Sequence, residues 1–177
     1  MIPSQIEHRL SHQDLVNIAY SWALTRGRCG VAFRELNTTT CNREYPDVIG
    51  FHSGGHSVLI ECKASRSDFL CDKKKTFRKY PERGMGDYRF YCCQTGLIKP
   101  EDLPERWGLI WVSPSGKSKC IVNPYCKSVI GNIWSNGHEK NWRAEHGLMY
   151  SALRRLHIKG YIDSIYDKQY NYSRKTV

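Results

Sequence analysis

The spacing of apolar and polar residues divides the first part of the chain into one helix and three strands. Residues 11–25 carry apolar side chains on one helical face, and Ser11 with Asp14 has the spacing of a capping box. Residues 31–36 alternate as a strand does. Two apolar runs then flank the sequence His-Ser-Gly-Gly-His at 52–56, whose glycines favour the positive φ angles of a tight turn. The pattern therefore predicts a helix, a strand and an antiparallel hairpin.

A second helix and three more strands are expected after the hairpin. Ser65 and Asp68 repeat the capping-box spacing, so a helix should begin there, carry the basic residues up to Lys79 and end before Pro81. The remaining apolar runs predict strands at 88–94, 107–112 and 119–124.

The last predicted helix covers residues 141–158. Its apolar side chains form one stripe, which predicts packing against the core. The stripe consists of Leu148, Met149, Ala152, Leu153 and Leu156. The polar tail at 167–177 is expected to fray, and its two lysines and one arginine could contact nucleic acid.

This order of elements predicts an α/β fold in which helices flank a mixed central β-sheet. The length of 177 residues suits one domain with a sizeable core. We expect that domain to span 1–177, with its core at about 11–117 and a C-terminal extension of a strand and a helix at about 118–177.

The charge of the chain indicates a polyanionic partner. Lys and Arg outnumber Asp and Glu by 27 to 17, for a formal charge of +10. Nucleic acid is the commonest partner of such a protein, although charge that serves only solubility is the alternative. No apolar run is long enough to span a bilayer, and residues 1–4 lack the features of a signal peptide. We therefore expect a cytoplasmic protein with no membrane association.

The eight cysteines form no Cys-x-x-Cys pair. In a reducing cytosol they are expected to be buried, reduced thiols. A structural zinc site assembled from distant cysteines is the alternative. The cysteines are Cys29, Cys41, Cys62, Cys71, Cys92, Cys93, Cys120 and Cys126.

The hairpin carries the chemistry that matters most. Glu61 and Lys63 share a face at the end of a strand whose pattern predicts burial, and closing the turn brings Asp47 beside Glu61. A buried strand rarely ends in charge, because removing a charge from water costs several kcal/mol unless a partner compensates. Two carboxylates and the backbone carbonyl of Cys62 are hard oxygen ligands for Mg²⁺ or Mn²⁺. Lys63 could then hold a water and offset developing negative charge.

These residues resemble the signature of the PD-(D/E)XK nuclease superfamily. The signature is Pro46-Asp47, thirteen intervening residues, and Glu61-Cys62-Lys63. The order of helix, three strands, helix and strand is also similar to the core of that superfamily. The resemblance implies a restriction-endonuclease-like core, with Asp47 and Glu61 as metal ligands and Lys63 as the catalytic lysine. It also implies an accessory role at the metal site for Glu35 on the first strand.

A narrower resemblance is to the MmcB-like group of DNA-repair nucleases and similar small phage proteins. It rests on the sequences ECKASRSDFLCDKK, YRFYCCQTGLI and LPERWGLIWVSPSGK, and it spans residues 31–117. It implies an Mg²⁺- or Mn²⁺-dependent endo- or exodeoxyribonuclease, a hydrolase of the bacterial or phage-infected cytosol. Residues 118–177 have no counterpart in it.

The basic run after the hairpin is expected to contact the phosphates of nucleic acid, most simply DNA. Its members are Lys73, Lys74, Lys75, Arg78 and Lys79. The alternative is a solvated helix face.

Plainer interpretations of the other polar residues also stand. Asp47 could close a turn, and Glu61 with Lys63 could form a surface ion pair. His52 and His56 could bind a metal but are more typical of an exposed turn.

Asp68 and Asp72 are expected to cap the helix and pair with its lysines rather than to bind a metal. For the whole chain, the alternative function is a catalytically silent module that keeps the nuclease fold and binds DNA or a protein. A homodimer or another protein partner also remains open.

Overall fold

Six strands form one mixed sheet in the computed structural model, which describes residues 9–125 and 134–166. The spatial order of the strands is their order in the chain. β3 pairs in parallel with β4, and β4 with β5; the other three pairings are antiparallel. The strands are β1 (Val31–Arg34), β2 (Val48–Phe51), β3 (Ser57–Lys63), β4 (Tyr88–Gln94), β5 (Gly108–Val112) and β6 (Ser118–Val122).

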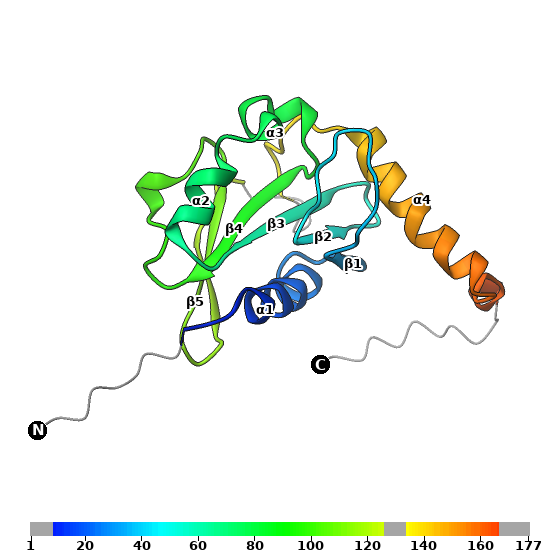
Figure 1. The fold of residues 1–177 in the computed structure, drawn as a ribbon, viewed down its shortest axis with the longest axis horizontal. Coiled ribbons are helices and arrows are strands. Elements are labelled where there is room, and N and C mark those ends of the chain that lie inside the picture. The colour runs from blue at the N-terminus through cyan, green and yellow to red at the C-terminus, as the bar shows by residue number, and fades with distance from the viewer. Residues whose placement is uncertain (1–8, 126–133, 167–177) are drawn as a thin grey trace, which may run out of the picture.

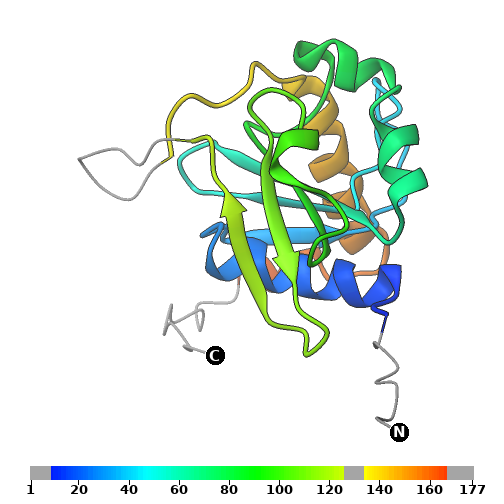
Figure 2. The ribbon, with the colours of Figure 1, turned by 90° about the vertical axis from the view of Figure 1, so that its left-hand side faces the viewer.

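Helices cover both faces of this sheet. In Figure 1, α1 lies below the sheet and α2 and α3 lie above it, while α4 extends to one side. Figure 2 shows the same arrangement with the hairpin of β5 and β6 in front. The α-helices are α1 (His12–Thr25), α2 (Arg66–Asp72), α3 (Thr76–Lys79) and α4 (Trp142–Ile158), and the 3₁₀ turns are η1 (Pro81–Arg83), η2 (Pro100–Asp102) and η3 (Ile162–Tyr166). The predicted α/β class, with a mixed sheet and a C-terminal helix, is confirmed.

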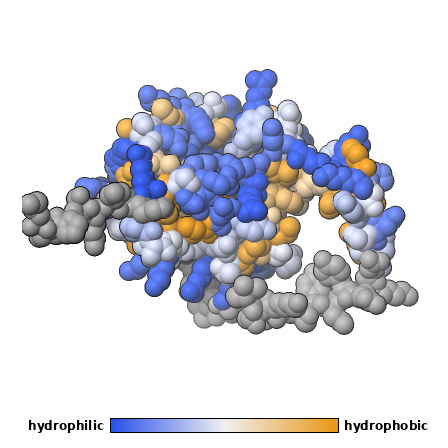
Figure 3. Space-filling model, turned by 60° about the horizontal axis from the view of Figure 1, so that its bottom comes forward, coloured by the Kyte–Doolittle hydropathy of each residue, from blue (hydrophilic) through white to orange (hydrophobic). Residues whose placement is uncertain are grey.

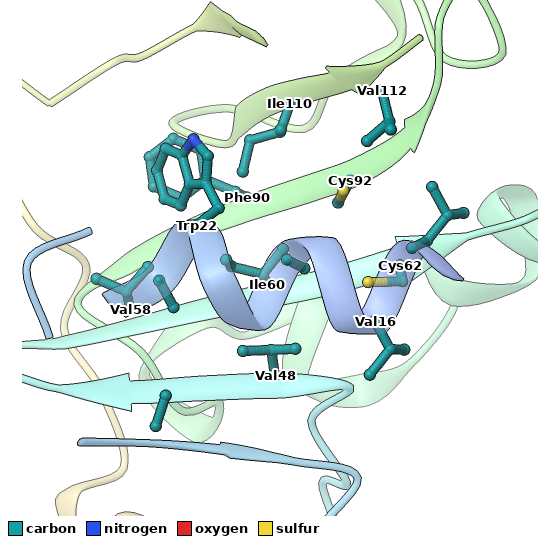
Figure 4. Close-up of a cluster of buried hydrophobic side chains, with 14 of the residues drawn as sticks. Val16, Trp22, Val48, Val58, Ile60, Cys62, Phe90, Cys92, Ile110 and Val112 are labelled. Carbon is teal, nitrogen blue, oxygen red and sulfur yellow. The ribbon is translucent and has the colours of Figure 1, made fainter. Parts of the chain in front are cut away.

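The first helix forms as its sequence predicts. The Ser11 side chain accepts a hydrogen bond from the Asp14 backbone N–H, and the Asp14 side chain accepts one from the Ser11 N–H, which completes the capping box. The buried face of α1 then packs on β2, β3, β4 and β5, as Figure 4 shows. The residues in contact include Val16, Trp22, Val48, Val58, Ile60, Cys62, Phe90, Cys92, Ile110 and Val112.

The opposite face of the sheet has its own core. Ile49, Leu59 and Leu109 point to this side, where Phe69 of α2 and Leu148 of α4 cover them. β3 lies between the two cores, and all seven of its residues are buried.

The prediction of a single helix between Ser65 and Pro81 is wrong, because the structure has two helices there. α2 ends at Asp72, and Lys75 has extended backbone angles before α3 begins at Thr76. The break has a geometric reason, because residues six apart on an unbroken helix lie about 240° apart around its axis. The turn lets Arg78 of α3 face the same way as Asp72, whose carboxylate it contacts.

The expected core packing of the C-terminal helix holds only for its first half. Ala144, Glu145 and Leu148 are buried, but Leu153 and Leu156 are 51% and 41% exposed. The apolar stripe continues after α4 has passed the edge of the sheet (Figure 1), so the described chain covers its later residues only in part. Figure 3 shows a small apolar patch on this projecting part of the molecule, among mostly hydrophilic residues.

Two smaller expectations also change or fall outside the structure. β1 ends at Arg34 rather than at residue 36, because Glu35 takes a positive φ of 45°. The tail at 167–177 and Cys126 lie outside the described residues. None of the helices in the described ranges has the length and apolar composition needed to cross a bilayer.

Candidate functional site

The β2–β3 hairpin brings Asp47 beside Glu61, as its spacing predicts. Val48 pairs with Ile60, so the next residue of each strand continues that register past the end of β2. The turn is closed by hydrogen bonds from the His52 N–H to the His56 carbonyl at 2.8 Å and from the Gly55 N–H to the His52 carbonyl at 3.0 Å. The site therefore lies at the end of the hairpin away from its turn.

Asp47 is anchored by the backbone of β3. Its Oδ2 accepts a hydrogen bond of 2.7 Å from the Cys62 N–H, which takes the place of a further ladder bond. The N–H and carbonyl of a strand residue face the same neighbour, so the Cys62 carbonyl also faces the Asp47 side of β3. The Cys62 side chain points the other way, into the core beneath α1 (Figure 4). The Asp47 carboxylate and the Cys62 carbonyl thus lie on the same side of β3, whereas the two Glu61 carboxylate oxygens contact Lys63 and Arg78.

The pKa of Asp47 is raised to about 7. Burial is the main cause, since the side chain is only 19% exposed, and the negative charge of Glu61 adds to it. The positive charge of Lys63 and the hydrogen bond from Cys62 act in the opposite direction. Two carboxylates this close favour either a shared proton or a bound cation.

A buried charge network surrounds Glu61. Its Oε2 lies 3.2 Å from the Lys63 Nζ, and its Oε1 lies 3.0 Å from the Arg78 guanidinium. Arg78 also contacts Glu44 at 2.5 Å and Asp72 at 2.9 Å. Lys63 lies 3.4 Å from Asp72. The side chains of Glu61 and Lys63 are only 3% and 4% exposed, so the alternative of a surface ion pair is wrong.

The network sets the charge state of its members. Burial alone would raise the pKa of Asp72, but Arg78 and Lys63 hold it well below the usual range. Burial lowers the pKa of Lys63, yet the surrounding carboxylates, Glu61 first, leave it above its ordinary value. Lys63 is therefore a fixed cation at neutral pH.

Glu35 lies beside the site rather than in it. Its N–H donates to the Asp47 carbonyl at 2.9 Å, which fixes its backbone next to β2. Its side chain is 43% exposed, and its Oε1 lies 3.4 Å from the His12 Nε2. The same histidine nitrogen lies 3.6 Å from the Asp47 Oδ1, so His12 joins the two acids.

The basic run divides into two groups. Lys73, Lys74, Lys75 and Lys79 are exposed, although the Lys75 Nζ contacts Asp72 at 2.6 Å. The Arg78 side chain is 2% exposed and paired with three carboxylates. This placement makes Arg78 an internal counter-ion and takes it out of the surface that DNA would contact.

The sequence interpretation missed Glu44 and His12 and assigned Asp72 only to the helix surface. Glu44 lies in a polar loop with no periodic pattern, and only its burial at 1% exposure marks it. Its Oε2 accepts a hydrogen bond of 2.6 Å from the Met85 N–H. Asp72 is also buried and accepts a hydrogen bond from the Tyr91 hydroxyl at 2.9 Å. Spacing along the sequence is local, so it could not show that Glu44 and Asp72 join Glu61, Lys63 and Arg78 in one buried network.

Of the remaining polar candidates, the two turn histidines lie outside this arrangement, and Asp68 lies at its exposed margin through its contact with Lys63. His52 and His56 lie at the turn of the hairpin, at the far end of the strands. Asp68 is half exposed; its N–H bonds to the Ser65 hydroxyl at the start of α2, and its Oδ1 lies 3.9 Å from the Lys63 Nζ.

Seven of the cysteines are free thiols, and within the described ranges no three His, Cys, Asp or Glu side chains group as a metal site. A zinc site of cysteines therefore has no support there. Mg²⁺ needs fewer protein ligands than zinc, because it keeps several of its waters and commonly takes one or two carboxylates. Asp47 and Glu61 supply two, and the Glu61 Oε1 makes no hydrogen bond despite its contact with Arg78. Asp47 and Glu61 are therefore the carboxylates that would hold a magnesium ion at this site.

Comparison with known proteins adds information about the fold. No protein-family model and no curated protein matches the chain. One solved structure is similar, that of a protein of unknown function from Silicibacter pomeroyi. It is 22% identical, with a TM-score of 0.56 over 89% of this chain and 92% of that one. The similarity indicates a shared fold across nearly the whole length of both chains.

Proposed function

We propose that the protein is a metal-dependent nuclease that hydrolyses phosphodiester bonds, most simply in DNA, on a restriction-endonuclease-like core. One observation carries the proposal. Asp47, Glu61 and Lys63 meet at one end of a hairpin, where Asp47 has a pKa raised to about 7 beside a second carboxylate and a fixed ammonium. This is the charge arrangement that the PD-(D/E)XK signature implies.

Asp47, Glu61 and the Cys62 carbonyl would hold Mg²⁺ or Mn²⁺, with Glu35 as an accessory acid. A divalent cation bound there would lower the pKa of a bound water and counter the charge of the scissile phosphate. The role of Asp47 depends on its charge: deprotonated, it offers Oδ1 as a ligand while Oδ2 stays on the Cys62 N–H. Asp47 is thereby preorganised for one orientation.

Lys63 supplies positive charge where negative charge develops. Its ammonium is held by Glu61 and Asp72, so it cannot swing into solvent. A fixed cation stabilises a transition state without reorganising, and its effect is larger where water is excluded. Lys63 is therefore assigned the catalytic ammonium of the proposed reaction.

The exposed lysines next to this site support nucleic acid as the substrate. Lys73, Lys74, Lys75 and Lys79 lie just after α2, the helix that follows β3, and the chain carries ten excess positive charges. Lysines increase affinity for DNA mainly through contacts with phosphates rather than with bases. This surface should therefore bind DNA without a preference for base sequence.

A second candidate is a catalytically silent module that binds DNA or a protein. Arg78 favours it, because its guanidinium lies 3.0 Å from the Glu61 oxygen that a metal would use. Glu61 is also only 2% exposed. In that case the network serves stability alone, and Asp47 and Glu61 bind no metal.

Cleavage separates the two candidates. The protein is incubated with single-stranded, double-stranded and branched DNA and with RNA, in Mg²⁺ or Mn²⁺. Asp47→Ala and Glu61→Ala should abolish cleavage and also Mn²⁺ binding measured by calorimetry, because each removes a ligand. Asp163→Ala, at an exposed acid on η3, is the matched control and should change neither. Full cleavage by either site variant would refute the assignment.

Binding tests the basic surface separately. Replacing Lys73, Lys74 and Lys75 by Ala should weaken DNA association and flatten the plot of log affinity against log salt, by about one in slope for each lost phosphate contact. A triple variant at the scattered, exposed Lys117, Arg143 and Lys159 carries the same charge change and serves as control. Equal slopes in the two triple variants would mean that the run after β3 is only a solvated face.

A further inference from the structure

A cavity of about 440 Å³ lies away from the proposed cleavage site. Val58, at the start of β3, lines it, whereas Glu61 and Lys63 lie at the end of that strand and on its other face. Figure 4 shows Trp22 of α1 near the Val58 end of β3, with Cys62 at the opposite end. The cavity is thus separate from the Asp47–Glu61–Lys63 site.

Aromatic rings form one wall of this cavity. Trp134 packs against Tyr88 with ring centres 5.2 Å apart and against Trp22 at 6.0 Å, and His56 lies 5.7 Å from Tyr88. The Tyr88 hydroxyl donates to the Trp134 carbonyl, which fixes the two residues relative to each other. Trp22 and Tyr88 are each 5% exposed, while Trp134 is half-buried and offers the more open ring. A planar apolar ligand would meet a rigid aromatic surface there.

Positive charge lines the rest of the cavity. Arg26 and Arg28 come from the loop after α1, and Lys119 comes from β6. The described lining includes no Asp or Glu, and none of these three cations forms an ion pair with another described residue. Unlike Lys63 and Arg78, they are available to an anion from outside.

The loop that carries the two arginines is held in place. The Cys29 N–H donates to the Ala23 carbonyl at 3.0 Å, and the Gly30 N–H donates to the Phe51 carbonyl at 2.9 Å. These bonds tie the loop to both α1 and β2. Two guanidinium groups on a fixed loop lose less freedom on binding than two on a mobile one.

We propose that this cavity binds a nucleotide, with its base against Trp134 and its phosphate on Arg28 and Lys119. Aromatic rings stack on any base, and arginine and lysine recognise phosphate. The volume lies within the range of roughly 300–1,000 Å³ typical of small-molecule sites. The ligand can be a free nucleotide or an unpaired nucleotide of a strand, which have the same chemistry.

The test is calorimetric titration of the full chain in EDTA, where no metal supports cleavage. The probes are dAMP, adenosine, inorganic phosphate and the octanucleotide of deoxyadenylate. We expect dAMP to bind at least tenfold more tightly than adenosine or phosphate, because only dAMP uses both walls. Octanucleotide binding that is tighter than dAMP binding and is weakened by Arg28→Gly would assign the site to a strand, and octanucleotide binding that Arg28→Gly leaves unchanged would assign it to free nucleotides.

Matched arginine variants provide the decisive comparison. Arg28 has a positive φ of 55°, so Arg28→Gly removes the guanidinium without straining the backbone. Arg43 has a φ of 57° and is exposed outside the cavity, so Arg43→Gly makes the same change elsewhere. Arg28→Gly should weaken dAMP binding at least tenfold, and Arg43→Gly should leave it unchanged.

Two results would overturn the proposal. One is the absence of saturable dAMP binding at millimolar concentration. The other is unchanged affinity in both Arg28→Gly and Lys119→Ala, the second being an exposed strand position that tolerates truncation. Repeating the titration with Asp47→Ala keeps the two proposals apart, since nucleotide binding should survive loss of the cleavage site.

Discussion

The two faces of β3 solve the problem of burial in different ways. Val58, Ile60 and Cys62 face α1 and pack among apolar side chains. On the other face, Leu59 packs in an apolar core, and Glu61 and Lys63 then end the strand in charge. One backbone therefore serves an ordinary core on one side and an ion network on the other.

The difference lies in what each face requires of its neighbours. An apolar face needs neighbours of suitable shape, and volume changes there cost energy in proportion to the cavity they leave. A charged face needs each charge matched by another, because a buried charge left alone is far more costly than a missing methyl group. Arg78 meets this need for Glu44, Glu61 and Asp72 together.

The largest expected effect comes from removing that shared cation. Arg78→Met keeps the length of the side chain but leaves its carboxylates with less compensation, and it should lower the free energy of unfolding by about 3–5 kcal/mol. Urea denaturation followed by circular dichroism measures it.

Two controls sharpen the comparison between the faces. Ile60→Val, on the α1 side of the same strand, should cost only about 0.5–1.5 kcal/mol. Arg83→Met, at a side chain 62% exposed, should cost less than about 1 kcal/mol. If Arg78→Met costs no more than Ile60→Val, the charged face does not depend on its shared cation.

Lys63→Met tests whether the charged face of β3 takes part in the proposed cleavage reaction. A catalytic lysine acts on charge that appears in the transition state, so single-turnover cleavage should slow about 100-fold, or about 2.7 kcal/mol, with little change in DNA affinity. Lys63→Arg should rescue poorly, because a planar fork cannot replace a compact ammonium.

Because Lys63 is buried, each variant also needs a thermal melt to show that it is folded. Rate and affinity falling together would make Lys63 a substrate-binding residue. No fall in either would contradict the nuclease mechanism.

The pH dependence of stability tests the exposed end of the charged face. The folded pKa of Asp47, about 7, lies above the value of about 3.9 in an unfolded chain, so the folded state binds the extra proton between these values. The contribution of Asp47 to the free energy of unfolding is therefore fully present at low pH. It is lost as the pH rises from about 4 to about 7, by up to about 1.4 kcal/mol per pH unit. Asp47→Asn should remove this loss while its side-chain oxygen keeps the bond from Cys62.

The measurement is the difference in unfolding free energy between the parent and Asp47→Asn across pH 4–8. Neighbouring charges of Glu61, Lys63, His12 and Glu35 are common to both proteins. Above pH 7, Mg²⁺ should stabilise the parent but not the variant. Parallel pH curves would mean that Asp47 is ionised normally.

Local patterns in the sequence were enough to predict the elements that frame the site. The capping residues of α1 and the glycine turn of the hairpin act over a few positions, so α1, β2 and β3 appear where expected. The alternation along β3 also placed Glu61 and Lys63 on one face. The closeness of Asp47 follows from the same register.

Features that depend on distant contacts could not be predicted in this way. The break between α2 and α3 exists because Arg78 reaches inward to residues from three other segments. Glu44 gains its role only from that contact. The apolar stripe of α4 was correct as a pattern, but no local signal shows where the sheet stops supporting it.

The register of the β2–β3 hairpin also restricts which insertions and deletions this part of the sequence can accept. Residues added at the 52–56 turn lengthen the spacer between Asp47 and Glu61 without moving either acid, because strand pairing fixes them. Deletion of one residue within β2 would instead turn Asp47 toward α1 and separate it from Glu61. Insertions and deletions should therefore be tolerated at the turn and eliminated by selection within the strands.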